Sequence, residues 1–194
     1  MVRTREFDPA TALSKAVELF SSKGYADTSM EDIVRATGVS RYGIYGTFGS
    51  KRELFEQALE RFAENMGKRS FLRLLDPDAS LASIERIFEE RIADICCQSE
   101  NAGCLILQTT TELASEDDEI REVLQKFMGR MSRTFAVGLK TAQEKGEVRA
   151  DLDVRAAGDL LTSTMFGIAV LGRAGFDNNA LRAIVRQSIE PMRA

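Results

Sequence analysis

Prolines are scarce in this chain: three of its 194 residues are proline, and they stand at positions 9, 77 and 191. Proline is tolerated in the first turn of a helix but breaks a helix further along, so the segments between these positions can form long helices. Those segments are rich in Ala, Leu, Glu, Lys and Arg, which favour helices. The sequence therefore predicts an all-α fold with about nine helices.

Composition argues against several classes of protein. The chain has no histidine, which removes histidine-based acid–base catalysis and every histidine metal site. Its three cysteines cannot all pair within one chain, which favours a reducing compartment. No apolar run approaches the roughly 18 residues that a membrane span needs. We therefore expect a cytoplasmic protein that is not an enzyme, holds no metal or other cofactor, and does not enter a membrane.

Helix boundaries are clearest near the N-terminus. Asp8 is a suitable N-cap and Pro9 suits the first helical position, so a first helix of about four turns is predicted to begin there and to end at Gly24. Thr28, with Glu31 three residues later, has the spacing of a capping box. This pair predicts the start of a second, short helix.

A third helix is predicted from its N-cap Ser40 to Phe48. Two short helices joined by a turn that contains glycine, here Gly38, are typical of a helix-turn-helix motif. Ile44 and Phe48 share the apolar face of the third helix, so we expect them to face the core. Residues 28–48 therefore predict a helix-turn-helix unit packed on the first helix.

The remaining face of the third helix is unusual for a helix that only packs against protein. It carries an arginine, two tyrosines, a threonine and a glycine: Arg41, Tyr42, Gly43, Tyr45 and Thr47. In a DNA major groove arginine can bind guanine or phosphate, tyrosine hydroxyls can reach phosphate, and a glycine lets the backbone approach. This face is therefore predicted to bind double-stranded DNA.

Residues 28–33, 38–40 and 44–54 resemble the DNA-binding domain of the TetR family of bacterial regulators, within a likeness that covers about residues 8–62. The resemblance implies that four residues contact phosphate: Thr28, Ser40, Tyr45 and Lys51. It implies that four others face bases: Arg41, Tyr42, Gly43 and Thr47. Gly46 and Thr47 depart from the family, which often has bulkier residues at these two positions.

The chain is predicted to have two domains. Residues 1–52 would form the helix-turn-helix DNA-binding domain, and residues 53–194 the regulatory, ligand-binding and dimerisation domain. Ser50 and Glu53 have the spacing of a second capping box, which begins a fourth helix over about residues 50–74. This fourth helix is expected to link the two domains.

The second domain contains methionine, aromatic and polar residues that suit the wall of a cavity for a largely apolar small molecule. The candidates are Phe88, Ile92, Cys104, Gln108, Thr111, Phe127, Met131 and Met165. Core packing is the simpler interpretation of any one of them. The cavity is favoured for the group mainly because the family resemblance implies one.

The three cysteines allow a second interpretation, in which the protein is a regulator that senses redox state through thiols. Cys96, Cys97 and Cys104 could serve this purpose, although a cysteine in an apolar run such as that around Cys104 is usually a small apolar filler. No second cysteine pair or histidine gives them the spacing of metal ligands. A helical small-molecule carrier that does not bind DNA is a third interpretation.

Self-association is predicted near the C-terminus. Residues 164–171 are apolar almost all round, and a helix of this kind must be covered on every side. We expect a homodimer through this helix and the last one, whose paired recognition helices, ~34–36 Å apart, would bind a palindromic operator. Together with the resemblance, this predicts a ligand-responsive transcriptional regulator, most simply a repressor that a small-molecule inducer releases from its operator.

Overall fold

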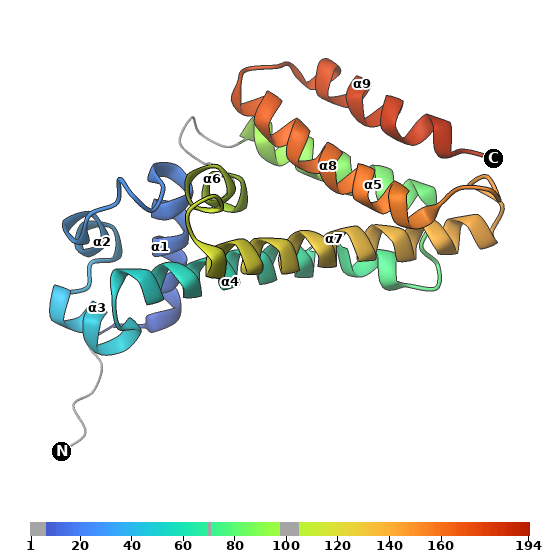
Figure 1. Cartoon of the computed structure of the whole chain (residues 1–194). Coiled ribbons are helices and arrows are strands. Elements are labelled where there is room, and N and C mark those ends of the chain that lie inside the picture. The colour runs from blue at the N-terminus through green and yellow to red at the C-terminus, as the bar shows by residue number, and fades with distance from the viewer. Residues whose placement is uncertain (1–6, 70, 98–104) are drawn as a thin grey trace. The chain divides into compact units, whose positions relative to one another are not determined.

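The computed structural model describes residues 7–69, 71–97 and 105–194. Within these ranges the chain forms nine α-helices and two short 3-10 helices, and it forms no strand beyond an isolated bridge between Val148 and Arg193 (Figure 1). The prediction of an all-α fold is confirmed.

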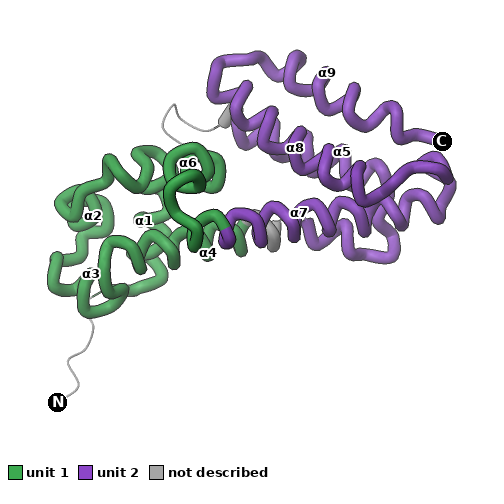
Figure 2. Tube along the Cα trace, in the orientation of Figure 1, with its two compact units in different colours: residues 1–65, 101–121 green, residues 66–100, 122–194 purple. Residues whose placement is uncertain are grey.

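The chain divides into two compact units, which Figure 2 shows in different colours. The first unit contains residues 1–65 and 101–121, and the second contains residues 66–100 and 122–194. Helix α6 (Leu105–Leu113) belongs to the first unit because it packs on α1 (Pro9–Lys23). This division by contacts differs from the sequence-based boundary after residue 52, which stays a prediction about function.

Four consecutive helices build the N-terminal part of the first unit: α1 (Pro9–Lys23), α2 (Met30–Thr37), α3 (Arg41–Phe48) and α4 (Lys51–Arg69). Each contributes large side chains to one core, of which Phe20, Ile33, Ile44 and Phe55 are fully buried. The rings of Phe20 and Phe55 meet edge to face at 5.1 Å between centroids. The N-cap of α1 is Asp8, as predicted, and the helix ends at Gly24.

The capping box of α2 lies one residue later than predicted. The Ser29 hydroxyl accepts a hydrogen bond from the Asp32 backbone N–H at 3.1 Å, and the Asp32 carboxylate accepts from the Ser29 N–H at 2.9 Å. Thr28 and Glu31 have the same sequence spacing, but Thr28 is only 1 % exposed and its hydroxyl donates to the Gly24 carbonyl. Burial of Thr28 therefore decides the register that spacing alone left ambiguous.

The second capping box is confirmed. The Glu53 N–H donates to the Ser50 hydroxyl at 3.1 Å, and the Ser50 N–H donates to the Glu53 carboxylate at 2.6 Å. Helix α4 begins directly afterwards, at Lys51, and runs to Arg69. The 3-10 helix Phe71–Leu75 follows it.

Long helices make up most of the second unit. They are α5 (Leu81–Cys97), most of α7 (Asp118–Glu144), α8 (Val154–Arg173) and α9 (Asn178–Ile189), and the 3-10 helix Glu190–Met192 follows α9. Helices α5, α8 and α9 pack on one another. The Phe88 ring of α5 stacks on the Phe135 ring of α7 at 5.7 Å, and Phe71 meets Phe135 edge to face at 5.1 Å.

Helix α8 is long and apolar enough to cross a membrane by length and composition alone. The search for unbroken apolar runs missed it because charged and polar residues interrupt its first half. Its packing against α5 and α9 accounts for the apolar character, since Leu161, Met165 and Ile168 are all buried within the unit. The composition of α8 is therefore that of a core helix.

Candidate nucleic-acid interface

Helix α3 presents one face to the core and the opposite face to solvent. Its N-cap Ser40 accepts a hydrogen bond from the Gly43 N–H at 3.2 Å, while Ile44 and Phe48 are buried. Helical spacing then places the tyrosines outward: the exposed fraction is 82 % for Tyr42 and 45 % for Tyr45. The sequence-based prediction that both tyrosines lie outside the core is confirmed.

Arg41, in the first turn of α3, is exposed and forms an ion pair with Glu31 of α2 at 3.3 Å. Exposed ion pairs of this kind contribute little free energy, typically about 0–1 kcal/mol. The Arg41 guanidinium can therefore leave Glu31 for a phosphate or a guanine at small cost.

The two glycines of α3 have different surroundings. A Cβ added at Gly43 would lie 2.8 Å from Cγ1 of Val39 and 3.3 Å from a ring carbon of Phe7, whereas a Cβ at Gly46 would meet nothing within 4 Å. Protein atoms therefore fill the space in the Cβ direction at Gly43, so packing alone accounts for this glycine, and a DNA contact by Gly43 stays a prediction. Gly46 is the glycine that leaves the outer surface open.

Thr28 and Ser40, two predicted phosphate ligands, have their hydroxyls engaged within the protein. The Thr28 side chain is buried and donates to the Gly24 carbonyl, so it is not part of the exposed surface. The expected phosphate contact by that side chain does not fit this geometry. Ser40 is exposed, and its hydroxyl oxygen accepts from Gly43 while its O–H remains available as a donor.

Lys51, another predicted phosphate ligand, is held in place at the start of α4. Its ammonium donates a hydrogen bond to the Tyr25 carbonyl at 2.5 Å and lies 4.2 Å from the centre of the Tyr25 ring. Desolvation by burial lowers the pKa of Lys51. The ammonium has further N–H donors with which to bind a phosphate.

Ion pairs hold the segments around this surface together. Lys23 of α1 bonds the Asp32 carboxylate of α2 at 2.5 Å, and this lysine holds the pKa of that carboxyl well below its usual range. Arg52 of α4 bonds Asp117, and the guanidinium lowers the pKa of Asp117 to about 2. The Asp117 carboxylate also accepts the Ile120 N–H at 3.0 Å, so it caps α7.

Two polar side chains of α6 contact the turn between α1 and α2. The Glu112 carboxylate accepts the backbone N–H groups of Tyr25, at 3.1 Å, and Ala26. With its amide oriented to satisfy both groups, Gln108 donates to the Ser21 carbonyl at 2.9 Å and accepts from the Gly24 N–H at 3.1 Å. Sequence reasoning missed Glu112, because a single glutamate on a helix normally indicates a solvent-facing position.

The seven predicted ligand residues that the structure describes are divided between the two units. Five of them are buried in the second unit: Phe88, Ile92, Phe127, Met131 and Met165. Gln108 and Thr111 belong to the first unit, where Thr111 is exposed and donates to a carbonyl of its own helix, and Cys104 lies outside the described residues. The ligand-binding role of these residues stays a prediction.

Arg91 is a charged residue on the side of α5 that otherwise faces the core. It stands three residues after Phe88 and four after Ile87, both buried, so the three share a helix face. Its Nε is buried without a hydrogen-bond partner within the described residues. Sequence reasoning missed Arg91 because arginine on a helix is usually solvated.

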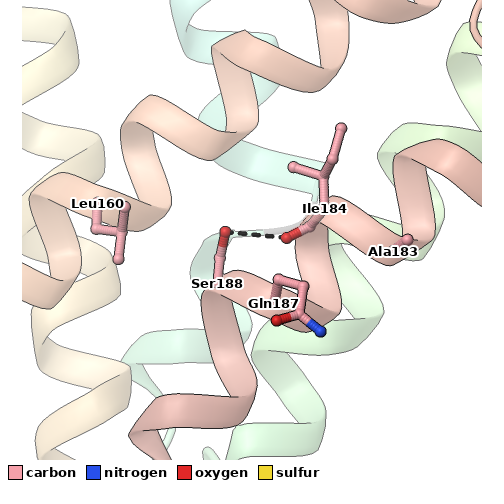
Figure 3. Close-up of a pocket in the computed structure, with 5 residues that line it drawn as sticks. All are labelled: Leu160, Ala183, Ile184, Gln187 and Ser188. Atoms are coloured by element: carbon pink, nitrogen blue, oxygen red, sulfur yellow. Dashed lines mark hydrogen bonds between the residues drawn. The ribbon is translucent and has the colours of Figure 1, made fainter.

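A shallow, open groove lies between α8 and α9. It is lined by Leu160, Ala183, Ile184, Gln187 and Ser188, and the Ser188 hydroxyl donates to the Ile184 carbonyl at 3.0 Å (Figure 3). Leu160 is 49 % exposed there. None of the predicted ligand residues lines this groove.

Comparison with known proteins identifies both parts of the chain. Residues 12–58 match the model of the bacterial regulatory proteins of the tetR family, and residues 80–188 match that of the tetracyclin repressor-like C-terminal domain. The chain belongs to the TetR family. As a member it is a DNA-binding transcriptional regulator, and α2 and α3 are its helix-turn-helix.

Relatives match this TetR-family regulator over most of its length. YezE of Bacillus subtilis, described as an uncharacterized HTH-type transcriptional regulator, is 27 % identical over 97 % of this chain and 98 % of its own. ComR of Escherichia coli, an HTH-type transcriptional repressor, is 29 % identical over 89 % of this chain and 83 % of its own. These relatives do not favour the redox-sensing alternative.

Solved structures share the fold. A cysteine mutant of the TetR-family regulator CifR, complexed with 26-base-pair operator DNA, has a TM-score of 0.85 at 23 % identity and covers 98 % of this chain and 99 % of its own. The regulatory protein TetR from Rhodobacter sphaeroides has the same TM-score at 20 % identity, with 94 % and 97 % covered. The described part of the chain therefore has the TetR fold.

Proposed function

We propose that this protein is a homodimeric, cytoplasmic repressor that leaves a palindromic operator when a small, largely apolar molecule binds its C-terminal unit. The observation that carries the proposal is the exposed face of α3, with Tyr42 82 % exposed above a buried Ile44. The relatives ComR and DhaR are transcriptional repressors, which supports the sign of regulation. The proposed function consists of binding DNA and binding a ligand, and it includes no catalytic step.

The exposed residues of α3 divide into two roles in this proposal. Arg41, Tyr42 and Thr47 would face base edges, because they lie on the outer side of the helix or at its margin. Ser40, Tyr45 and Lys51 would bind phosphate through an O–H or N–H that is still available. Residues 28 and 43 would act only by shaping the unit from inside.

The ligand would act by changing the population of two conformations. A molecule that binds better to the conformation with badly spaced recognition helices weakens DNA binding by its difference in affinity for the two. Helices α4 and α7 each contribute to both units, so they connect the ligand site to the DNA-binding helices. The buried methionines and aromatic residues of the second unit would contact the ligand, and Arg91 would receive an anionic group if it has one.

Two substitutions separate base contacts from phosphate contacts. Tyr42→Ala should change the relative affinities for operator variants, by the roughly 5- to 150-fold that about 1–3 kcal/mol per base contact implies. Lys51→Ala should weaken binding to every sequence alike and should reduce the slope of log affinity against log salt by about one per protomer. Both are measured by fluorescence anisotropy on the DNA upstream of the protein's own gene, at several salt concentrations.

Lys126→Ala is the matched control for charge. Lys126 lies on α7 in the second unit, where its ammonium is exposed and pairs with Glu122 at 3.1 Å. This variant should bind DNA like the wild type. Unchanged binding in both Tyr42→Ala and Lys51→Ala would assign DNA binding to another surface, and a wild-type protein that binds the small molecule but no DNA would be a carrier.

A further inference from the structure

The turn between α1 and α2 is held from two sides by charged groups of other helices. Glu112 of α6 accepts the N–H groups of Tyr25 and Ala26, the first at 3.1 Å. Lys51 of α4 donates to the Tyr25 carbonyl at 2.5 Å. Hydrogen bonds that involve an ionised group are about twice as strong as those between neutral groups.

A single peptide group stands between the two charges. The Tyr25 carbonyl and the Ala26 N–H belong to the same peptide bond, so its oxygen points to the Lys51 ammonium and its hydrogen points to the Glu112 carboxylate. Each charge polarises this peptide in the direction that strengthens the hydrogen bond to the other charge. The position of Lys51 is thereby coupled to Glu112, which lies 61 residues away in sequence.

Close packing adapts the turn to this contact. A Cβ at Gly24 would lie 2.7 Å from the Glu112 carboxylate and 2.9 Å from the Gln108 amide, so a side chain there would displace the ends of these two side chains from their contacts with the turn. Gly24 also has a φ of +87°, which other residues rarely adopt. The Tyr25 ring is fixed in turn against Phe55, at 4.7 Å between centroids, and under Lys51.

We propose that Glu112 is a positioning residue for DNA binding: it orients the Tyr25–Ala26 peptide, which in turn holds the Lys51 ammonium where it can reach a phosphate. This inference rests on the proposed phosphate contact of Lys51. Without the carboxylate this peptide loses the acceptor of its Ala26 N–H and can rotate, so Lys51 loses its fixed partner. Helix α6 then contributes to DNA affinity without touching DNA.

Glu112→Gln tests the proposal because the proposal predicts weaker DNA binding, whereas the loss of a negative charge by itself predicts stronger DNA binding. Removing a negative charge from a DNA-binding protein should by itself strengthen binding to the phosphate backbone. We expect instead roughly tenfold weaker binding to every DNA sequence, the effect of one charge-assisted hydrogen bond, and a reduced salt slope as in Lys51→Ala. Glu112→Asp keeps the charge but shortens the side chain, and should lose less affinity.

Glu116→Gln is the matched control. Glu116 is an exposed glutamate in the turn that follows α6, only four residues from Glu112. This variant should bind DNA as tightly as the wild type or more tightly. In the double variant Glu112→Gln/Lys51→Ala, the second substitution should add little to the loss, because both remove the same contact.

Equal or tighter DNA binding by Glu112→Gln, or losses that simply add in the double variant, would overturn the proposal. A second measurement needs no DNA: amide hydrogen exchange at Tyr25 and Ala26 should accelerate in Glu112→Gln relative to Glu116→Gln, while the melting curve stays cooperative. Unchanged exchange would also overturn it. Failure of the wild type to bind DNA, with faster exchange in the variant, would instead contradict the proposed function and leave the Glu112 contact standing.

Discussion

At the scale of single residues, the two glycines of α3 show how one residue type serves two purposes. Gly43 is required by packing, since a Cβ would lie 2.8 Å from Val39. Gly46 has open space, so the fold gains nothing from it, and glycine costs a helix about 1 kcal/mol relative to alanine. Since packing does not require glycine at this position, we propose that Gly46 allows DNA to approach the helix backbone.

Alanine at each position separates these purposes. Gly46→Ala should raise the free energy of unfolding by up to about 1 kcal/mol and weaken operator binding, because its methyl group occupies the open surface. Gly43→Ala should lower the free energy of unfolding by about 1–3 kcal/mol through its clash with Val39. Chemical denaturation and DNA titration measure the two quantities; wild-type affinity in Gly46→Ala would show that DNA does not approach the backbone there.

Residue-scale prediction from sequence succeeded where local spacing decides and failed where distant segments meet. The outward position of Tyr42 and Tyr45 followed from the buried positions of Ile44 and Phe48 four residues apart. The contact of Glu112 with the turn between α1 and α2 joins residues 86 and 87 positions apart, and no local pattern marks it. The crowding at Gly43 is partly local, since Val39 lies only four residues earlier, and only the contact with Phe7 joins distant segments.

At the scale of elements, the open groove between α8 and α9 is the surface that suits the proposed dimer. Leu160 is half exposed there although it stands on an apolar helix, and Thr164 and Ser188 join the two helices by a hydrogen bond at 3.1 Å. A second copy of the same face would cover Leu160 and its neighbours across a two-fold axis.

Leu160→Glu should dissociate the dimer, because pairing would bury two unpartnered carboxylates at the symmetric contact. Sedimentation velocity should show the monomer at concentrations where the wild type is dimeric. Val137→Glu is the control: Val137 is exposed to a similar extent, 45 %, but lies on α7 outside the groove. A dimer that survives Leu160→Glu would place the interface on another surface.

Element boundaries were predictable wherever caps and periodicity agree. Asp8 and Ser40 are the N-caps of the helices that were predicted to follow them, and Ser50 forms the predicted capping box with Glu53. The start of α2 was wrong by one residue, because Thr28 and Ser29 both have an acidic residue three positions later and only burial distinguishes them. The spacing of capping residues thus predicts that a helix begins in this region, and tertiary packing decides which residue is its N-cap.

At the scale of the whole molecule, the proposed repressor needs three features: an exposed recognition helix, a unit that binds the ligand, and a face that pairs with a second copy. Composition and periodicity predicted the fold class. The residues that contact a ligand stay a prediction: Gln108 and Thr111 belong to the first unit and the other described candidates to the second. Cavities form between segments, and local patterns do not encode them.

Selection of DNA sites from a random pool, with the wild-type protein and Tyr42→Ala in parallel, tests whether the exposed face of α3 determines which DNA sequence the protein binds. We expect the wild type to enrich an inverted repeat whose half-sites are centred one helical turn or a small multiple apart, as two symmetric recognition helices require. Tyr42→Ala should enrich a changed half-site with the same spacing. A pool that shows no enriched sequence, or the same half-site for both proteins, would show that Tyr42 on α3 does not contact the bases of an operator.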